Sequence, residues 1–233
     1  MKKKIIISIS LFLLAIIAFF SLLFLMFNDN DKTRQLYYDN IEEENQDREI
    51  LSRFDELLAI NPETIGWLKV PNTNIDYPVV KGSDNRFYLN HDFYQEPEIR
   101  GAIYMDYRNT GDGSDRHTII YGHQSRLGIM FTELNKYKER EFFDKNEIIY
   151  LTTLYEEQEW QVFAAYETST SFYYIVTDFS SDASFLSTVE QFQKRSKFAR
   201  DVKITKDDQI LTLSTCVYGV DDMRFVVQAK RIK

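Results

Sequence analysis

The feature that most limits the fold is a succession of short β-type runs that begins after Pro62. These runs are rich in β-branched and aromatic residues, and clusters of turn residues separate them, for example at 109–115. About eight runs are present, at 65–70, 75–80, 102–105, 118–121, 148–151, 160–166, 210–216 and 225–232. Because few helical segments interrupt them, the pattern predicts a mostly β domain that closes into a barrel or a sandwich.

Three segments have helical rather than extended periodicity. The first is predicted at about 33–60, with one apolar face and a stop at Asn61-Pro62; the face consists of Ile50, Leu51, Phe54, Leu57 and Leu58. The other two are predicted at 130–137 and 183–197. No repeat or linker is visible within 62–233, so we predict a single folded domain there.

An uncharged apolar run occupies positions 5–27 and follows three lysines at 2–4. Its length is sufficient to cross a hydrocarbon layer of roughly 30 Å, and the lysines favour a cytoplasmic N-terminus. A cleaved signal peptide is the alternative, but its apolar region would be shorter and would end in small residues. We therefore predict a single-pass cell-membrane protein with a cytoplasmic tail (1–4), a transmembrane anchor (5–27), a polar exit with a helical segment (28–61) and an extracytoplasmic domain (62–233).

The charge balance excludes some classes of partner. The chain carries 28 Lys and Arg against 36 Asp and Glu, and three of the lysines precede the apolar run. An acidic domain is unsuited to binding nucleic acid or to lying flat on anionic lipid. The single cysteine, Cys216, excludes an intramolecular disulfide. It is therefore either a small buried residue or one retained for its chemistry.

Three reactive side chains fall at the edges of predicted strands. His123 follows the run at 118–121 and a glycine, Cys216 ends the run at 210–216, and Arg224 opens the next strand. The short connection between Cys216 and Arg224 allows both to lie at the same end of adjacent strands. His123 can join them only through tertiary folding.

These three residue types suit acyl transfer through a thioester. A thiolate attacks a peptide carbonyl, and neighbouring cations increase the thiolate fraction. An arginine can meet the negative charge that develops on the carbonyl oxygen. A histidine can protonate the departing amine and then deprotonate the incoming one.

Each of these residues also has a simpler interpretation. His91 and His117 are competing candidates for the base, although both are typical of surface positions. Arg224 could be a surface strand residue paired with Asp221 or Asp222. Residue types and spacing alone leave these alternatives open.

Taken together, the three segments resemble the sortase family. Residues 212–216, Thr-Leu-Ser-Thr-Cys, resemble the family's Thr-Leu-x-Thr-Cys strand, and Gly122-His123 and Arg224 match the other two catalytic positions. The resemblance covers about 62–233 and is strongest to class B, through Ser214, the segments 88–93, 105–109 and 121–124, and the long helix-bearing connection before the cysteine strand. Gln124 is a departure, because many relatives have Asn after the histidine.

The resemblance implies an eight-stranded barrel with an N-terminal helix and a groove beside the active site. It implies a cysteine transpeptidase of the thiol protease type, with catalytic Cys216, His123 and Arg224. Such an enzyme cleaves a C-terminal sorting signal after Thr, in a motif of the Asn-Pro-x-Thr or Leu-Pro-x-Thr kind, and transfers the protein to a peptidoglycan amine. Carried over by position, the candidate groove residues are Asn85, Leu89, Tyr121 and Ser214, and we expect neither a metal nor another cofactor.

Two alternatives remain open from the sequence. The first is another sortase type, such as a housekeeping or pilus-polymerising enzyme, or one that acts mainly as a hydrolase. The second is a membrane-tethered binding module in which Cys216 is inert. Thiol reactivity of the folded domain separates the second alternative from an enzyme.

Overall fold

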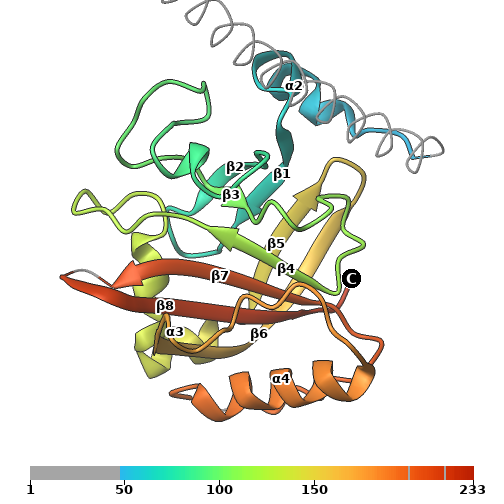
Figure 1. The fold of residues 1–233 in the computed structure, drawn as a ribbon, viewed down its shortest axis with the longest axis vertical. Coiled ribbons are helices and arrows are strands. Elements are labelled where there is room, and N and C mark those ends of the chain that lie inside the picture. The colour runs from blue at the N-terminus through green and yellow to red at the C-terminus, as the bar shows by residue number, and fades with distance from the viewer. Residues whose placement is uncertain (1–47, 199, 218) are drawn as a thin grey trace, which may run out of the picture. The chain divides into compact units, whose positions relative to one another are not determined.

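Eight strands close into a β-barrel in the computed structural model, which describes residues 48–198, 200–217 and 219–233 (Figure 1). The strands are β1 (Thr64–Lys69), β2 (Asp76–Val80), β3 (Tyr104–Met105), β4 (His117–Tyr121), β5 (Ile148–Thr153), β6 (Glu157–Ser169), β7 (Ile210–Val217) and β8 (Val220–Arg231). Their order around the barrel is β1-β2-β3-β4-β7-β8-β6-β5, and β5 pairs with β1 to close it. The predicted eight-stranded, mostly β architecture is therefore confirmed.

Strand β7 lies between β4 and β8 and pairs differently with each. Its pairing with β4 is parallel, with Tyr121 opposite Ser214, whereas its pairing with β8 is antiparallel, with Cys216 opposite Arg224. Parallel neighbours end at the same edge of a sheet, and an antiparallel hairpin turns back at that edge. The end of β4, the end of β7 and the start of β8 therefore meet at one rim of the barrel.

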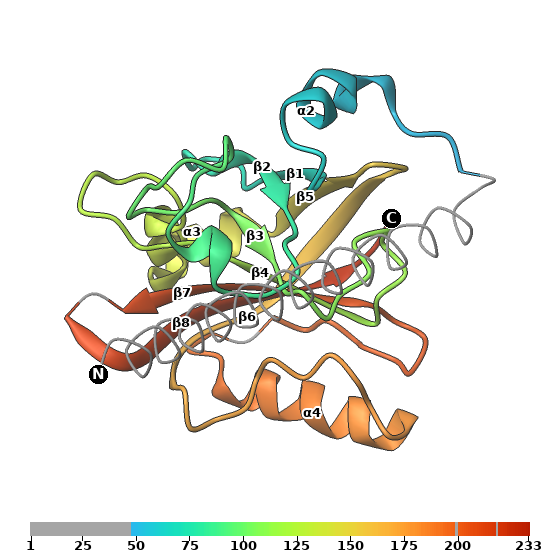
Figure 2. The same cartoon turned by 45° about the horizontal axis from the view of Figure 1, so that its top comes forward.

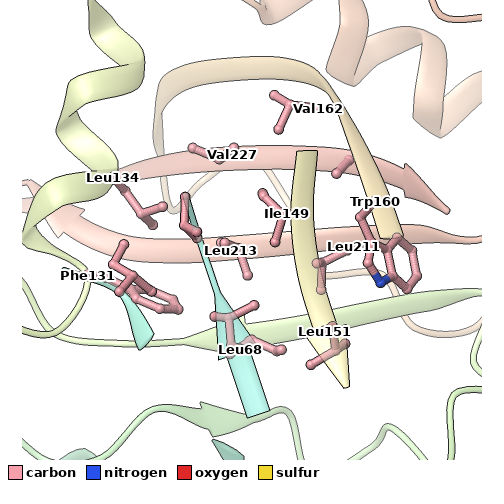
Figure 3. Close-up of a cluster of buried hydrophobic side chains, with 14 of the residues drawn as sticks. Leu68, Phe131, Leu134, Ile149, Leu151, Trp160, Val162, Leu211, Leu213 and Val227 are labelled. Atoms are coloured by element: carbon pink, nitrogen blue, oxygen red, sulfur yellow. The ribbon is translucent and has the colours of Figure 1, made fainter. Parts of the chain in front are cut away.

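The interior of the barrel is filled by apolar side chains that alternate along the strands. Figure 3 shows these side chains converging from several strands; they include Leu68, Ile149, Leu151, Trp160, Val162, Leu211, Leu213 and Val227. Successive residues of a strand point to opposite faces. Because Leu211 and Leu213 point inward, Cys216 lies on the outer face of β7, together with Thr212 and Ser214.

The long connection from β6 to β7 covers this outer face and contains helix α4 (Asp182–Arg195), seen beside β6 and β8 in Figures 1 and 2. The helix begins at Ser181, whose Oγ accepts a hydrogen bond from the Ser184 amide at 3.1 Å. Its buried stripe packs in one apolar cluster with residues of β6, β7 and β8; the stripe is Phe185, Val189 and Phe192. The helix predicted before the cysteine strand is thereby confirmed, with bounds slightly different from 183–197.

The remaining helical elements are short. They are η1 (Ser52–Phe54), α2 (Asp55–Ile60), η2 (Phe87–Leu89), η3 (Thr132–Lys138) and α3 (Arg140–Lys145). The helix predicted at 130–137 is thus a 3-10 helix that begins two residues later.

The helix predicted at 33–60 is wrong over residues 48–51, which are not helical. The Leu51 amide donates to the Leu154 carbonyl at 2.8 Å instead of to the preceding turn of a helix. Of the predicted apolar face, only Phe54 is buried, and Ile50 is 42% exposed. Residues 33–47 lie outside the described part of the chain.

The predicted membrane segment also lies outside it. The tail at 1–4, the anchor at 5–27 and most of the segment at 28–61 fall before residue 48. Among the described residues, no helix combines the length and apolar character that a bilayer crossing requires.

Candidate functional site

A cavity of about 330 Å³ opens at the rim where β4, β7 and β8 meet. Its lining includes all of the residues predicted for the site, namely Cys216, His123, Arg224, Asn85, Leu89, Tyr121 and Ser214. These residues come from segments far apart in the sequence. Closure of the barrel therefore brings together the side chains that the sequence left separate.

Cys216 lies where β7 emerges from the core. Residues 210–215 of the strand are buried, whereas Cys216 is partly exposed and is a free thiol. Its cross-strand partner is Arg224, which lies inside β8 rather than at its start, because β8 begins at Val220. The Arg224 Nη1 donates to the Met223 carbonyl at 2.9 Å. The alternative pairing with Asp221 concerns a side chain outside the described set.

His123 is held at the rim by the residue before it and by a loop carbonyl. The Gly122 amide donates to the Ser214 carbonyl at 3.2 Å, which extends the pairing of β4 and β7 up to the histidine. A Cβ at Gly122 would lie 2.5 Å from Ile103 Cδ1 and 2.7 Å from Phe131 Cγ, so only glycine fits there. The His123 Nε2 lies 2.7 Å from the Leu89 carbonyl. Because a carbonyl only accepts, this contact places a proton on Nε2 and leaves Nδ1 as the basic nitrogen of the neutral ring.

The two competing histidines do not line the cavity. His117 is completely buried, contrary to the surface position considered for it, and its ring is bonded on both sides, by the Val176 carbonyl at 2.6 Å and the Thr212 hydroxyl at 2.7 Å. Burial lowers the pKa of His117 to about 4, against the opposing effect of the Val176 bond. His91 stacks on Phe87 with 4.1 Å between the ring centroids.

Two tyrosines that the sequence did not single out flank the thiol. Burial raises the pKa of the Tyr104 phenol, with a further rise from Cys216. Burial also raises the pKa of Tyr174, although the bond of its hydroxyl to Ser214 Oγ, at 2.7 Å, opposes the rise. Both phenols are therefore neutral at physiological pH and can donate hydrogen bonds at the cavity wall.

One wall of the cavity was missed by the sequence reasoning. It belongs to the connection between β6 and α4 and consists of Thr170, Phe172, Tyr173, Tyr174 and Ile175. We name these residues the 170–175 wall. The available signal was three consecutive aromatic residues at 172–174 in a stretch with no strand or helix period.

The buried carboxylate of Asp106 accepts hydrogen bonds from two of the predicted groove residues. The Asp106 Oδ2 accepts from the Asn85 Nδ2 at 3.0 Å and from the Tyr121 hydroxyl at 2.7 Å. The Asn85 Oδ1 accepts in turn from the Tyr107 amide at 3.0 Å. Burial opposes ionisation of Asp106, but bonds from Arg108 and Tyr121 outweigh it and lower the pKa of Asp106 below its ordinary value. Asp106 is therefore ionised at neutral pH.

The cavity thus combines a thiol, an imidazole and a guanidinium with neutral phenol donors. These are the groups that acyl transfer through a covalent intermediate requires. Within the described part of the chain, no group of three or more His, Cys, Asp or Glu side chains is placed to hold a metal ion.

Comparison with known proteins gives a consistent answer. The family model for the sortase domain matches residues 68–232. The chain is 34% identical to sortase B of Staphylococcus aureus over 239 residues, which covers 99% of this chain and 98% of that protein. It is also 34% identical to sortase B of Listeria monocytogenes over 204 residues, covering 87% of this chain and 83% of the relative.

Solved structures agree with the sequence relatives. A crystal structure of a Bacillus anthracis protein described as similar to sortase B shares 40% identity and a TM-score of 0.76, covering 87% of this chain and 96% of that one. A Staphylococcus aureus sortase B-substrate complex shares 36% identity and a TM-score of 0.75, covering 87% of this chain and 94% of that one. The chain therefore belongs to the sortase family of cysteine transpeptidases, and its relatives are sortases of class B.

Proposed function

We propose that this sortase cleaves a sorting signal after Thr through a thioester on Cys216 and passes the acyl group to a peptidoglycan amine. The observation that carries the proposal is the meeting of Cys216, His123 and Arg224 around one open cavity. The partly exposed thiol also disfavours the alternative of a binding module with an inert, buried cysteine.

In the first step, the Cys216 thiolate attacks the carbonyl carbon of the Thr residue of the signal. A C–S bond forms, the C–N bond of the scissile peptide breaks, and His123 gives a proton to the departing amine. In the second step, the acceptor amine attacks the thioester, loses its proton to His123 and releases the thiolate. Water in place of the amine gives hydrolysis, which is the thiol protease activity expected of the same site.

The bond between His123 and Leu89 assigns the atom through which these protons pass. Because Nε2 is held by the Leu89 carbonyl at 2.7 Å, Nδ1 is the nitrogen that exchanges protons with thiol and amine. The contact also fixes the plane of the His123 ring. In nucleophile-base arrangements a third group commonly orients the base in this way.

Arg224 is the group that we assign to the oxyanion. It lies opposite Cys216 across the β7–β8 pair and lines the same cavity. Its Nη1 donates to the Met223 carbonyl, which orients the head group, and the permanent positive charge beside the thiol attracts the negative charge that develops on the carbonyl oxygen.

We assign the sorting signal to the rest of the cavity lining. Asn85, Leu89, Tyr121 and Ser214 form one side, and the 170–175 wall forms another. The lining is mainly apolar and aromatic with a few polar groups, which suits a short peptide with a proline. A sortase B of Staphylococcus aureus has been solved as a substrate complex.

We also propose that residues 5–27 anchor the protein in the cell membrane, with residues 1–4 in the cytoplasm and the catalytic domain outside. The uncharged run and the preceding lysines support this orientation. The location agrees with an acceptor in the cell wall.

The test is an incubation of the full chain in detergent with peptides that carry Asn-Pro-Ala-Thr or Leu-Pro-Ala-Thr and with a panel of amines, followed by mass spectrometry of the products. We expect cleavage after Thr and an acyl product joined to the amine. Peptides that remain intact under all acceptors would contradict the proposed reaction.

Alkylation of the thiol tests the catalytic arrangement separately. Cys216 in the native chain should react readily with iodoacetamide, and His123→Ala should lower the rate. His91→Ala serves as the matched control, because His91 lies outside the cavity lining. A rate that is unaffected by His123→Ala would remove the histidine from the mechanism.

A further inference from the structure

The proposed reaction leaves one ion pair beside the cavity, between buried Asp106 and partly exposed Arg108, without a role. The Asp106 side chain is completely buried, and Arg108 binds it through two parallel bonds, from Nε to Oδ1 and from Nη2 to Oδ2, both at 2.7 Å. Neither residue lines the cavity. The same carboxylate accepts from Asn85 and Tyr121, which do line it.

The guanidinium of Arg108 reaches the opposite side of the cleft as well. Its Nη1 donates to the Tyr173 hydroxyl at 2.8 Å, and its Nη2 donates to the Ile175 carbonyl at 3.1 Å. Both partners belong to the 170–175 wall. The pair of Asp106 and Arg108 therefore connects the two sides of the cavity through one set of charge-assisted hydrogen bonds.

The bonds from Arg108 tie the exposed part of the wall, next to Tyr174, which is buried and whose hydroxyl bonds Ser214. Residues 173–179 have no regular secondary structure, so no ladder of backbone bonds holds them. Tyr173 is 58% exposed and gains little from burial. Loops of this kind open at low cost in free energy unless side chains tie them to a rigid element. Here the anchor is Arg108, in the loop after β3, and its partner Asp106 directly follows that strand.

We propose that Asp106 and Arg108 act as a positioning pair that holds the two sides of the cleft at the spacing that the peptide requires. The inference rests on the proposed function, since it assigns the cleft to a peptide. The pair touches neither the thiol nor the reacting carbonyl in this scheme, so it governs the affinity of the cleft and not the chemical step.

The main test is Arg108→Gln in the full chain, compared with the native chain on the Asn-Pro-Ala-Thr peptide at a fixed amine concentration. We expect KM to rise by at least about tenfold and kcat to change by less than about threefold, because binding requires the wall and chemistry does not. Alkylation of Cys216 by iodoacetamide should stay within about twofold of the native rate. Arg108→Lys should resemble Arg108→Gln, because an ammonium cannot reproduce the fork.

The chain offers a matched control for this substitution. Arg100 binds Glu98 through the same two-residue spacing and the same paired geometry, with Nε to Oε1 at 2.8 Å and Nη2 to Oε2 at 2.6 Å. Arg100 does not line the cavity. Arg100→Gln should therefore leave KM and kcat unchanged.

A second variant keeps the proposal testable if Arg108→Gln does not fold. Tyr173→Phe removes only an exposed hydroxyl and should raise KM by a fewfold. In the Arg108→Gln background the same change should add nothing, because its partner has gone.

The outcomes separate the two proposals. A native chain that neither binds nor cleaves the peptide contradicts the proposed function. A native chain that works, with an unchanged KM in both Arg108→Gln and Tyr173→Phe, overturns the positioning pair alone. A fall in kcat and in alkylation rate together would overturn it too, since the pair would then act on the thiol.

Discussion

A histidine lies at each end of the paired strands β4 and β7, and the two histidines have opposite surroundings. We call the end at His117 the closed end and the end at His123 the open end. At the closed end, His117 is completely buried and bonded on both ring nitrogens, in contact with Thr212 of β7. At the open end, His123 is partly exposed, has one ring nitrogen bonded to Leu89, and shares a cavity with Cys216. The difference shows that burial and partners, rather than residue type, separate a structural histidine from one available for proton transfer.

The polar groups at the closed end form a continuous chain. The Gln228 Nε2 donates to the Thr212 hydroxyl at 3.1 Å, and the Tyr166 hydroxyl donates to the Gln228 Oε1 at 3.2 Å. His117 thus belongs to a buried network that spans four adjacent strands. Networks of this kind stabilise one arrangement of the strands when every member is satisfied.

The sharpest test of the comparison is removal of the thiol at the open end. Cys216→Ala should abolish transpeptidation, because no other group can form the thioester. Its melting temperature should stay within about 2 °C of the native chain, since the side chain is small and partly exposed. Product formation is followed by mass spectrometry and unfolding by circular dichroism. Turnover comparable to the native chain would remove the mechanism.

The next largest effect is expected for the cation opposite the thiol. Arg224→Ala should reduce kcat/KM by about 10²–10³, the usual result of deleting an oxyanion-side donor. Arg224→Lys should also be slow, because a single ammonium lacks the fork. A loss below about tenfold for the alanine variant would restrict Arg224 to a structural role. Near-native rates with lysine would show that charge alone suffices.

The closed end makes a prediction about acid stability. The pKa of His117 is about 4 in the folded chain, below the ordinary value near 6.5 that applies after unfolding. As the pH falls, the unfolded chain therefore binds a proton at His117 before the folded chain does. The neutral ring contributes fully to the stability of the fold above about pH 6.5, and this contribution is lost as the pH falls towards 4. The loss is on the order of 3 kcal/mol.

Urea unfolding at several pH values measures this loss. The gap in stability between the native chain and His117→Asn should narrow as the pH falls from about 7 to 4. A gap for His117→Asn that is independent of pH would contradict the assignment of a buried neutral ring.

The smallest effect concerns the hydroxyl pair between Tyr174 and Ser214. Tyr174→Phe and Ser214→Ala should each lower the free energy of unfolding by about 1 kcal/mol, because each removes one buried hydrogen bond. The double variant should cost less than the sum of the two, which chemical denaturation can resolve. Strict additivity would show that the two hydroxyls do not interact in solution.

Much of the fold could be read from the sequence because the strand signal is local. The runs at 65–70, 118–121 and 210–216 coincide with β1, β4 and β7 to within a residue or two. The prediction of a helix at 33–60 was wrong over 48–51 because it rested only on the periodicity of the apolar residues. The Leu51 amide instead donates to the Leu154 carbonyl, and a tertiary hydrogen bond of this kind has no sequence signature.

The candidate site was predictable in part for a similar reason. Cys216 and His123 lie at strand ends that the pattern defines, whereas Arg224 lies inside β8, and the resemblance supplied the grouping of the three. Their catalytic roles stay predictions. The 170–175 wall and its anchor, Arg108, escaped notice because long-range side-chain contacts across an irregular segment leave no periodic pattern.

The sequence by itself determined the strand content, the single thiol and the family, because these depend on residue identity and on local periodicity. Only the tertiary structure decided which histidine shares a cavity with the thiol and which is enclosed. That choice depends on the parallel register of β4 with β7, which brings Tyr121 opposite Ser214 and buries His117 under the β6–β7 connection. Register is a property of the assembled sheet, so the same two imidazoles acquire different solvation and different partners only once the barrel has closed.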